Sequence, residues 1–142
     1  MIPKAIKFIV IGAFCARILL LSGILIHSGT EGVFLPDSRG FYQTAVNVTL
    51  GHGFSRDSVA PFLPSAYFPP LYPLLIAGSL ALADSVLPLI ILQILLSSLI
   101  PLLIWRIGAI LTERRGPPLI AAALAAFEPL MMLWSAVLLT DV

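Results

Sequence analysis

The sequence predicts an all-α, polytopic helical membrane protein, and three observations lead to this fold class. Hydrophobic residues make up 59% of the 142 residues, and charged residues make up only 11%. The mean hydropathy of +1.06 implies more apolar surface than the core of so small a soluble domain could enclose. The apolar residues also fall into runs of roughly the 20 residues that a bilayer-spanning helix needs. We therefore expect a protein integral to the lipid bilayer.

Charge and cysteine content bear on other classes. The formal net charge is +1, so the chain lacks the basic face that nucleic-acid binding requires, and no nucleic-acid partner is expected. The single cysteine, Cys15, lies in an apolar run and excludes a disulfide within the chain. His, Asp and Glu show no metal-ligand spacing, so the spacing predicts no metal site.

The first predicted span covers residues 6–26. Lys4 and Lys7 stand at its start, which places the N-terminus in the cytoplasm by the positive-inside rule. No small-x-small cleavage site follows, so an uncleaved helix is expected rather than a signal peptide. Arg17 lies inside this span, where an arginine needs a partner or a wet cavity.

Two further spans are expected over residues 86–111 and 119–139. Pro101 marks a possible kink in the second span. The dipeptide Glu128-Pro129 interrupts the third.

The loop before the second span is predicted to be extracytoplasmic and to cover residues 27–85. Its apolar stretch 71–83 is too short to cross a bilayer and is interpreted as interfacial or re-entrant. With this count, the arginines of the turn 112–116 lie in the cytoplasm, as the positive-inside rule requires. Asp37 and Asp141 then emerge on the same, non-cytoplasmic face.

The polar part of this loop begins with an amphipathic helix. Asp37 precedes the pattern and Gly51 ends it. The expected apolar face carries Phe41, Ala45 and Val48, and the expected polar face carries Ser38, Arg39, Gln43, Thr44 and Asn47. Such a helix is expected to lie in the membrane interface. Five prolines between residues 61 and 73 then disfavour regular structure.

The chain is expected to form a single membrane domain over residues 1–142. Three spans and one large loop make a poor closed bundle. We therefore expect this domain to be the N-terminal part of a longer protein.

Several motifs resemble polytopic GT-C glycosyltransferases, chiefly the protein O-mannosyltransferases and the lipid A aminoarabinose transferases. They are Asp37 opening a helix after the first span, Gly-His-Gly-Phe at 51–54, Phe-Pro-Pro-Leu-Tyr-Pro at 68–73, and Leu-Leu-Thr-Asp at 138–141. The resemblance covers nearly the whole chain, but only the N-terminal part of such an enzyme.

This resemblance implies transfer of a sugar from a polyprenyl-phosphate carrier to a hydroxyl of a protein, lipid or glycan acceptor. The reaction would take place at the extracytoplasmic face of a bacterial or archaeal plasma membrane. Asp37 and Asp141 match the acidic loop positions of the family. Two departures are Ser38, where many relatives carry a second acidic residue, and Glu128, where a small or polar residue is more usual.

Asp37 is the candidate general base that takes the proton of the acceptor hydroxyl. The alternative is that Asp37 only caps the helix that follows it. Asp141 could orient the acceptor, bind a divalent cation that neutralises the carrier phosphate, or cap a following helix.

Four further residues are candidate substrate contacts. Arg39 and Arg56 could bind the carrier phosphate, or alternatively lipid headgroups. His52 between two glycines is a turn residue or a ligand. Tyr72, with Tyr67 and Phe68, could stack on a sugar or anchor the loop at the headgroup level.

Two other expectations concern the membrane part. Arg17 and Glu128 fall at similar depths and could form a buried ion pair. The carrier groove is expected to continue beyond Val142, so residues 1–142 alone are expected to be inactive. The alternative function is a non-enzymatic membrane scaffold or transporter subunit that uses the loop for docking, and broken helices at mid-membrane would favour a transporter.

Overall fold

The structure is a computed structural model that describes residues 3–114 and 116–138, and within these ranges all regular elements are helices. The chain divides into two compact units. The span unit comprises Met1–Val33 and Leu92–Val137, and the loop unit comprises Phe34–Ile91 and Leu138–Val142. The all-α expectation is confirmed for the described residues.

The first predicted span is a single long helix. Helix α1 covers Lys4–Ser28, and the 3₁₀ helix η1 continues it over Gly29–Val33. Together they form an apolar helix of 30 residues, long enough to cross a bilayer. No proline or aspartate interrupts the run after Pro3, so the helix extends a few residues beyond each predicted end.

The second predicted span is built from two helices in sequence, α4 over Leu87–Ser98 and α5 over Ile100–Leu111. They form one candidate span of 25 residues, Leu87–Leu111. The interruption at Leu99 stands two residues before Pro101, whose ring nitrogen has no hydrogen to donate to the preceding turn. The Ser98 hydroxyl donates to the carbonyl of Ile94 at 2.7 Å just before this point. The interruption lies next to Pro101, where a kink was expected, and the two helices still form one candidate span.

The third predicted span is bent. Helix α6 covers Gly116–Ala126 and helix α7 covers Pro129–Ala136, and the two meet at an angle of 48°. They count as a third span if the bent pair crosses as one. Among the residues that the structure describes, two or three helices have membrane-spanning length and composition, which indicates a membrane protein.

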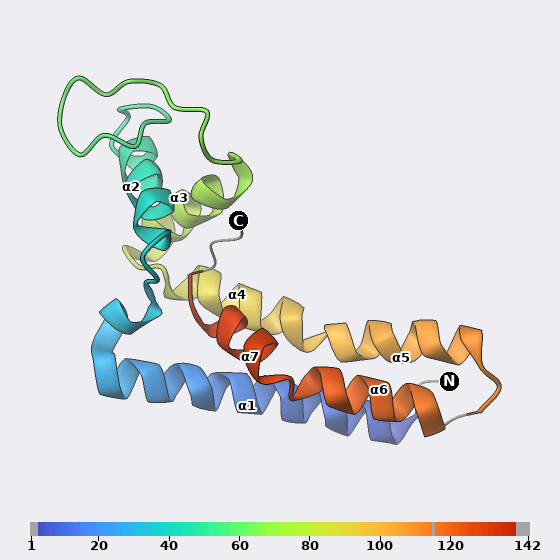
Figure 1. The fold of residues 1–142 in the computed structure, drawn as a ribbon. Helices are drawn as coiled ribbons and strands as arrows, with labels where there is room; N and C mark the ends of the chain where they lie inside the picture. The colour runs from blue at the N-terminus through green and yellow to red at the C-terminus, as the bar shows by residue number, and fades with distance from the viewer. Residues whose placement is uncertain (1–2, 115, 139–142) are drawn as a thin grey trace. The chain divides into compact units, whose positions relative to one another are not determined.

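Small residues let the helices of the span unit approach closely. Helices α6 and α7 pack against α1, and α5 packs against α6 and α1 (Figure 1). Ala13, Ala122 and Ala126 have no exposed surface. A Cβ atom on Gly108 of α5 would lie 3.0 Å from the Cβ atom of Pro118 in α6. Such contacts are typical of helices packed in membranes. Lipid gives no hydrophobic driving force between helices, so their association depends on the close packing that small side chains allow.

The loop unit is organised by a helix pair. Helix α2 covers Ser38–Thr49 and packs against α3, which covers Leu71–Ala83 (Figure 1). The Ser79 hydroxyl of α3 donates to the carbonyl of Ser85 at 2.7 Å and accepts from the amide of Leu89 at 3.3 Å. These bonds tie the end of α3 to the first turn of α4. Helix α3 has 13 residues, as expected for a segment too short to cross.

The predicted polar face of α2 is wrong in one respect. Ser38, Thr44 and Asn47 were expected on a hydrated face, but all three are buried. Each finds a backbone partner: the Thr44 hydroxyl donates to the carbonyl of Gly40 at 3.0 Å, and Ser38 and Asn47 bond to neighbouring loops. A hydroxyl or amide group can be buried at small cost when it is hydrogen-bonded. Part of the predicted polar face of α2 is therefore packed inside the loop unit.

Candidate functional site

Asp37 occupies the N-cap position of α2, but its side chain makes no capping hydrogen bond. The backbone of Asp37 is helical, with φ −76° and ψ −27°, whereas a residue whose side chain caps a helix typically has an extended backbone. Ser38 fixes the turn instead, since its hydroxyl accepts from the amide of Leu35 at 2.6 Å and donates to the carbonyl of Leu35 at 2.7 Å. The carboxylate of Asp37 therefore stays on the surface and is not used to cap the helix.

A stack of aromatic rings stands beside the first turn of α2. The rings of Phe41 and Phe68 are stacked with centroids 3.9 Å apart, and Tyr72 meets Phe41 edge to face at 5.6 Å. A Cβ atom on Gly40 would lie 2.8 Å from Cζ of Phe68. Only glycine at this position allows the ring of Phe68 to approach the helix backbone so closely.

Arg56 lies on the outer side of these rings. Its guanidinium carbon is 4.3 Å from the centroid of Tyr67 and 4.8 Å from that of Phe68, within cation–π range. Nη2 of Arg56 is 3.8 Å from the position of a Cβ atom on Gly40. The guanidinium therefore lies near the first turn of α2, which directly follows Asp37. The cation–π contacts hold this exposed cation in a defined place.

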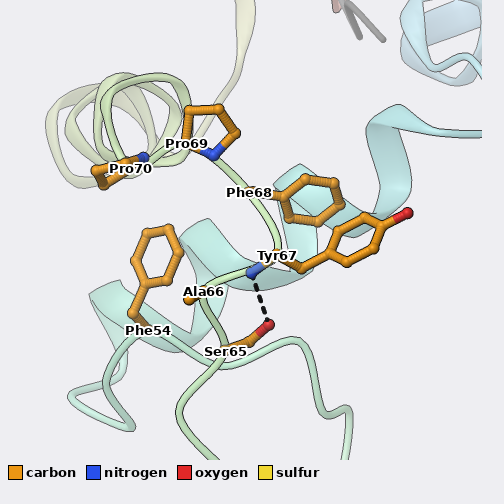
Figure 2. Close-up of a pocket in the computed structure, with 7 residues that line it drawn as sticks. All are labelled: Phe54, Ser65, Ala66, Tyr67, Phe68, Pro69 and Pro70. Atoms are coloured by element: carbon orange, nitrogen blue, oxygen red, sulfur yellow. Dashed lines mark hydrogen bonds between the residues drawn. The ribbon is translucent and has the colours of Figure 1, made fainter.

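A pocket of about 440 Å³ adjoins the same rings. Figure 2 shows the residues that line it: Phe54, Ser65, Ala66, Tyr67, Phe68, Pro69 and Pro70. The lining is mostly carbon, and the Ser65 hydroxyl accepts from the amide of Tyr67 at 3.4 Å. The pocket is an open apolar hollow on the surface rather than an enclosed cavity.

His52 lies at the other end of α2. Gly51 and Gly53 adopt positive φ values of 77° and 80°, which form the turn that ends the helix. The ring of His52 stacks on Phe62 with centroids 3.9 Å apart. The twelve residues of α2 correspond to about 18 Å of helix. The structure therefore does not bring His52 together with Asp37 and Arg56.

Of the other predicted site residues, two lie in the described part of the chain and one lies outside it. Tyr72 joins the aromatic stack through Phe41, and Arg39 is exposed in the first turn of α2. Asp141 lies outside the described residues. Within residues 3–114 and 116–138, no group of three or more His, Cys, Asp or Glu side chains could hold a metal ion.

Sequence reasoning missed Asp57 and Asn47 as the residues that shape the loop. The carboxylate of Asp57 accepts from the Ser55 hydroxyl at 3.0 Å and from the amide of Leu63 at 2.8 Å. The amide nitrogen of Asn47 donates to the carbonyls of Ser55 at 2.8 Å and Asp57 at 2.9 Å. The available signal was an Asp shortly before a proline-rich segment, since an Asp side chain in a loop commonly bonds nearby amides.

The expected ion pair between Arg17 and Glu128 is not found in the part of the chain that the structure describes. Arg17 is 1% exposed, and its Nη1 donates to the carbonyls of Ala13 at 3.0 Å and Ala126 at 2.9 Å. The carboxylate of Glu128 instead accepts from the amide of Met131 and caps α7. The break at Pro129 explains this, because it creates two helix ends that each attract one charge.

Comparison with known proteins adds no assignment, since no family model, curated protein or solved structure matches the chain. The resemblance to GT-C glycosyltransferases stays a prediction that rests on the motifs alone.

Proposed function

We propose that the chain is part of a membrane glycosyltransferase that moves a sugar from a polyprenyl-phosphate carrier to an acceptor hydroxyl at the extracytoplasmic face. The observation that supports this best is the exposed carboxylate of Asp37, which the helix behind it does not use for capping. A general base must be accessible to the acceptor hydroxyl, and an exposed carboxylate can take its proton.

The surroundings of Asp37 suit a negatively charged, partly apolar donor. In this proposal, Arg56 and Arg39 neutralise the carrier phosphate, since one guanidinium group can donate two parallel hydrogen bonds to phosphate oxygens. Tyr72 and the ring stack form the apolar wall beside them. His52 has no role in the chemistry, because it lies at the far end of α2 and its ring stacks on Phe62.

The chemistry requires few groups. Asp37 takes the proton of the acceptor hydroxyl as its oxygen bonds to the anomeric carbon, and the bond from that carbon to the carrier phosphate breaks. The phosphate leaves with the electron pair of this bond, so no general acid is needed. The negative charge of Asp37 also favours the positive character that develops on the sugar ring.

A transporter subunit is the second candidate, and the bend between α6 and α7 is the observation that favours it, since broken helices form ion sites in transporters. Such sites use open helix ends. Here Glu128 caps the start of α7, and Arg17 bonds the carbonyl of Ala126 at the end of α6. Each helix end at the break is already bonded to a charged side chain of this protein, which favours a structural bend over a transport site.

The test compares sugar transfer from labelled polyprenyl-phosphate donors, in membranes, by the full-length protein that contains residues 1–142 and by its Asp37→Asn variant. Loss of a base of this kind is expected to lower turnover about 10²–10⁴-fold. Asp84→Asn is the matched control, because Asp84 is exposed and its left-handed backbone, with φ 49°, suits asparagine. Equal turnover by a folded Asp37→Asn variant would remove Asp37 as the base.

A further inference from the structure

The segment Ser58–Pro64, which we term the apolar tip, exposes large hydrophobic side chains at a turn of the loop unit. Val59 is 72% exposed and Leu63 is 63% exposed. Ala60 and Pro61 between them are exposed as well. Exposed apolar side chains that gather on one short turn mark a contact surface more often than isolated ones do.

The apolar tip is held in place from behind. Its two arms meet in an antiparallel bridge between Ser55 and Pro64, and the amide of Ser65 donates to the carbonyl of Phe54 at 2.9 Å. The carboxylate of Asp57 holds the amide of Leu63. Asn47, which is only 2% exposed, anchors the base of the turn to α2. The exposed side chains therefore belong to a built turn rather than to an open loop.

The composition of the tip suits an apolar environment. No charged residue occurs from residue 58 to residue 83, and the nearest carboxylate, Asp57, is turned inward to the amide of Leu63 and the hydroxyl of Ser55. Pro61 and Pro64 have no amide hydrogen, and the amide of Leu63 is bonded internally. Fewer unpaired amides lower the cost of moving irregular backbone out of water.

We propose that the apolar tip inserts into the outer part of the bilayer and makes a third type of membrane contact, beside the spans and α3. The occupant of this surface is lipid. Only six residues separate Pro64 from α3, whose Leu71 and Leu82 are 69% and 86% exposed. The tip is thus joined by a short uncharged segment to a helix that also exposes large apolar side chains. This inference does not depend on sugar transfer.

Val59 is the probe position. The full chain, with Cys15→Ser to remove the native thiol, carries Val59→Cys labelled with an environment-sensitive fluorophore. It is reconstituted into phosphatidylcholine vesicles, with and without phosphatidylglycerol, that contain lipids spin-labelled near the headgroup. We expect a blue-shifted emission and strong quenching by the spin-labelled lipid, equal in both vesicle types because the tip is uncharged.

Thr49→Cys is the matched control, since Thr49 is an exposed polar residue at the end of α2. Its label is expected to be quenched far less. A second substitution, Leu63→Asp, is expected to abolish the quenching at position 59 while the chain stays folded.

Three results would overturn the proposal. The first is a label at position 59 that is quenched no more than the label at position 49. The second is quenching that requires phosphatidylglycerol, which would assign the contact to charged headgroups. The third is a label in native membranes that aqueous iodide cannot reach and spin-labelled lipid does not quench, which would assign the surface to a protein.

Discussion

Asp37 and Glu128 each stand at the N-cap position of a helix, and the two units use them differently. Glu128 in the span unit has an extended backbone, and its carboxylate caps α7. Asp37 in the loop unit has a helical backbone, and its carboxylate does not cap α2. Asp is a preferred N-cap residue and Glu is not, so the residue types alone would have assigned a cap to Asp37 rather than to Glu128. The backbone conformation decides which carboxylate serves the fold and which one is left for another task.

The same contrast holds for the polar residues around them. In the span unit the buried guanidinium of Arg17 in α1 donates to the carbonyl of Ala126, at the end of α6. In the loop unit the buried polar residues Ser38, Thr44 and Asn47 are uncharged, while Arg56 and Asp37 remain exposed. A charge inside a span persists only where it satisfies other groups, because desolvation is costly. In the loop unit, Asp37 and Arg56 are exposed to solvent, whereas the carboxylate of Asp57 bonds inward to Ser55 and Leu63.

The largest effect is expected for Asn47→Ala, which tests whether buried uncharged groups hold the loop unit together. The carbonyls of Ser55 and Asp57 would each lose a donor, at about 1–3 kcal/mol for each one that stays buried. Unfolding in detergent and hydrogen exchange of the amides around Leu63 measure the loss. Thr49→Ala, at an exposed position, is the control and is expected to change stability by about 0.5 kcal/mol or less. Unaltered exchange in Asn47→Ala would mean that the loop does not depend on this clamp.

Gly40→Ala tests whether the ring stack needs its close approach to α2. The new methyl group would meet Phe68 at 2.8 Å, and overpacking of this kind costs about 1–3 kcal/mol. Gly78→Ala in α3 is the matched control, because a Cβ atom there has nothing within 4 Å. Its expected effect has the opposite sign, since alanine stabilises a helix by about 1 kcal/mol relative to glycine. If both variants lose stability alike, the approach of Phe68 is not what requires Gly40.

The smallest effect is expected at the helix break, where Glu128→Ala removes a cap worth about 0.5–2 kcal/mol. Arg17→Gln is expected to destabilise the span unit separately, because it removes the donor to Ala126. Since the two side chains serve different helix ends, the losses should add in the double variant. Unfolding free energies of all four proteins in detergent give the coupling. A double variant that recovers part of the loss would indicate a direct pair instead.

The fold was predictable where it depends on local apolar length. The predicted spans 6–26 and 86–111 agree with the helical segments Lys4–Val33 and Leu87–Leu111 to within a few residues at most ends. Pro101 and Pro129 also mark the observed breaks, because a missing amide hydrogen acts where it stands. The start of α2 after Asp37 was predictable for the same reason, although the role of its side chain was not.

The arrangement of the candidate site depended on the tertiary structure. Arg56 lies beside Gly40 only because Tyr67 and Phe68 fold back onto α2. Asn47 is buried because the loop at Ser55 returns to it. His52 matched a motif, yet it lies at the end of α2 away from Asp37.

The sequence by itself determined the membrane helices and their breaks, since hydropathy and missing amide hydrogens are properties of consecutive residues. Only the tertiary structure decided which polar groups serve the fold and which stay exposed. A hydrogen bond joins residues that can be far apart in the chain, as Arg17 and Ala126 are. The pattern of residue types does not contain this pairing.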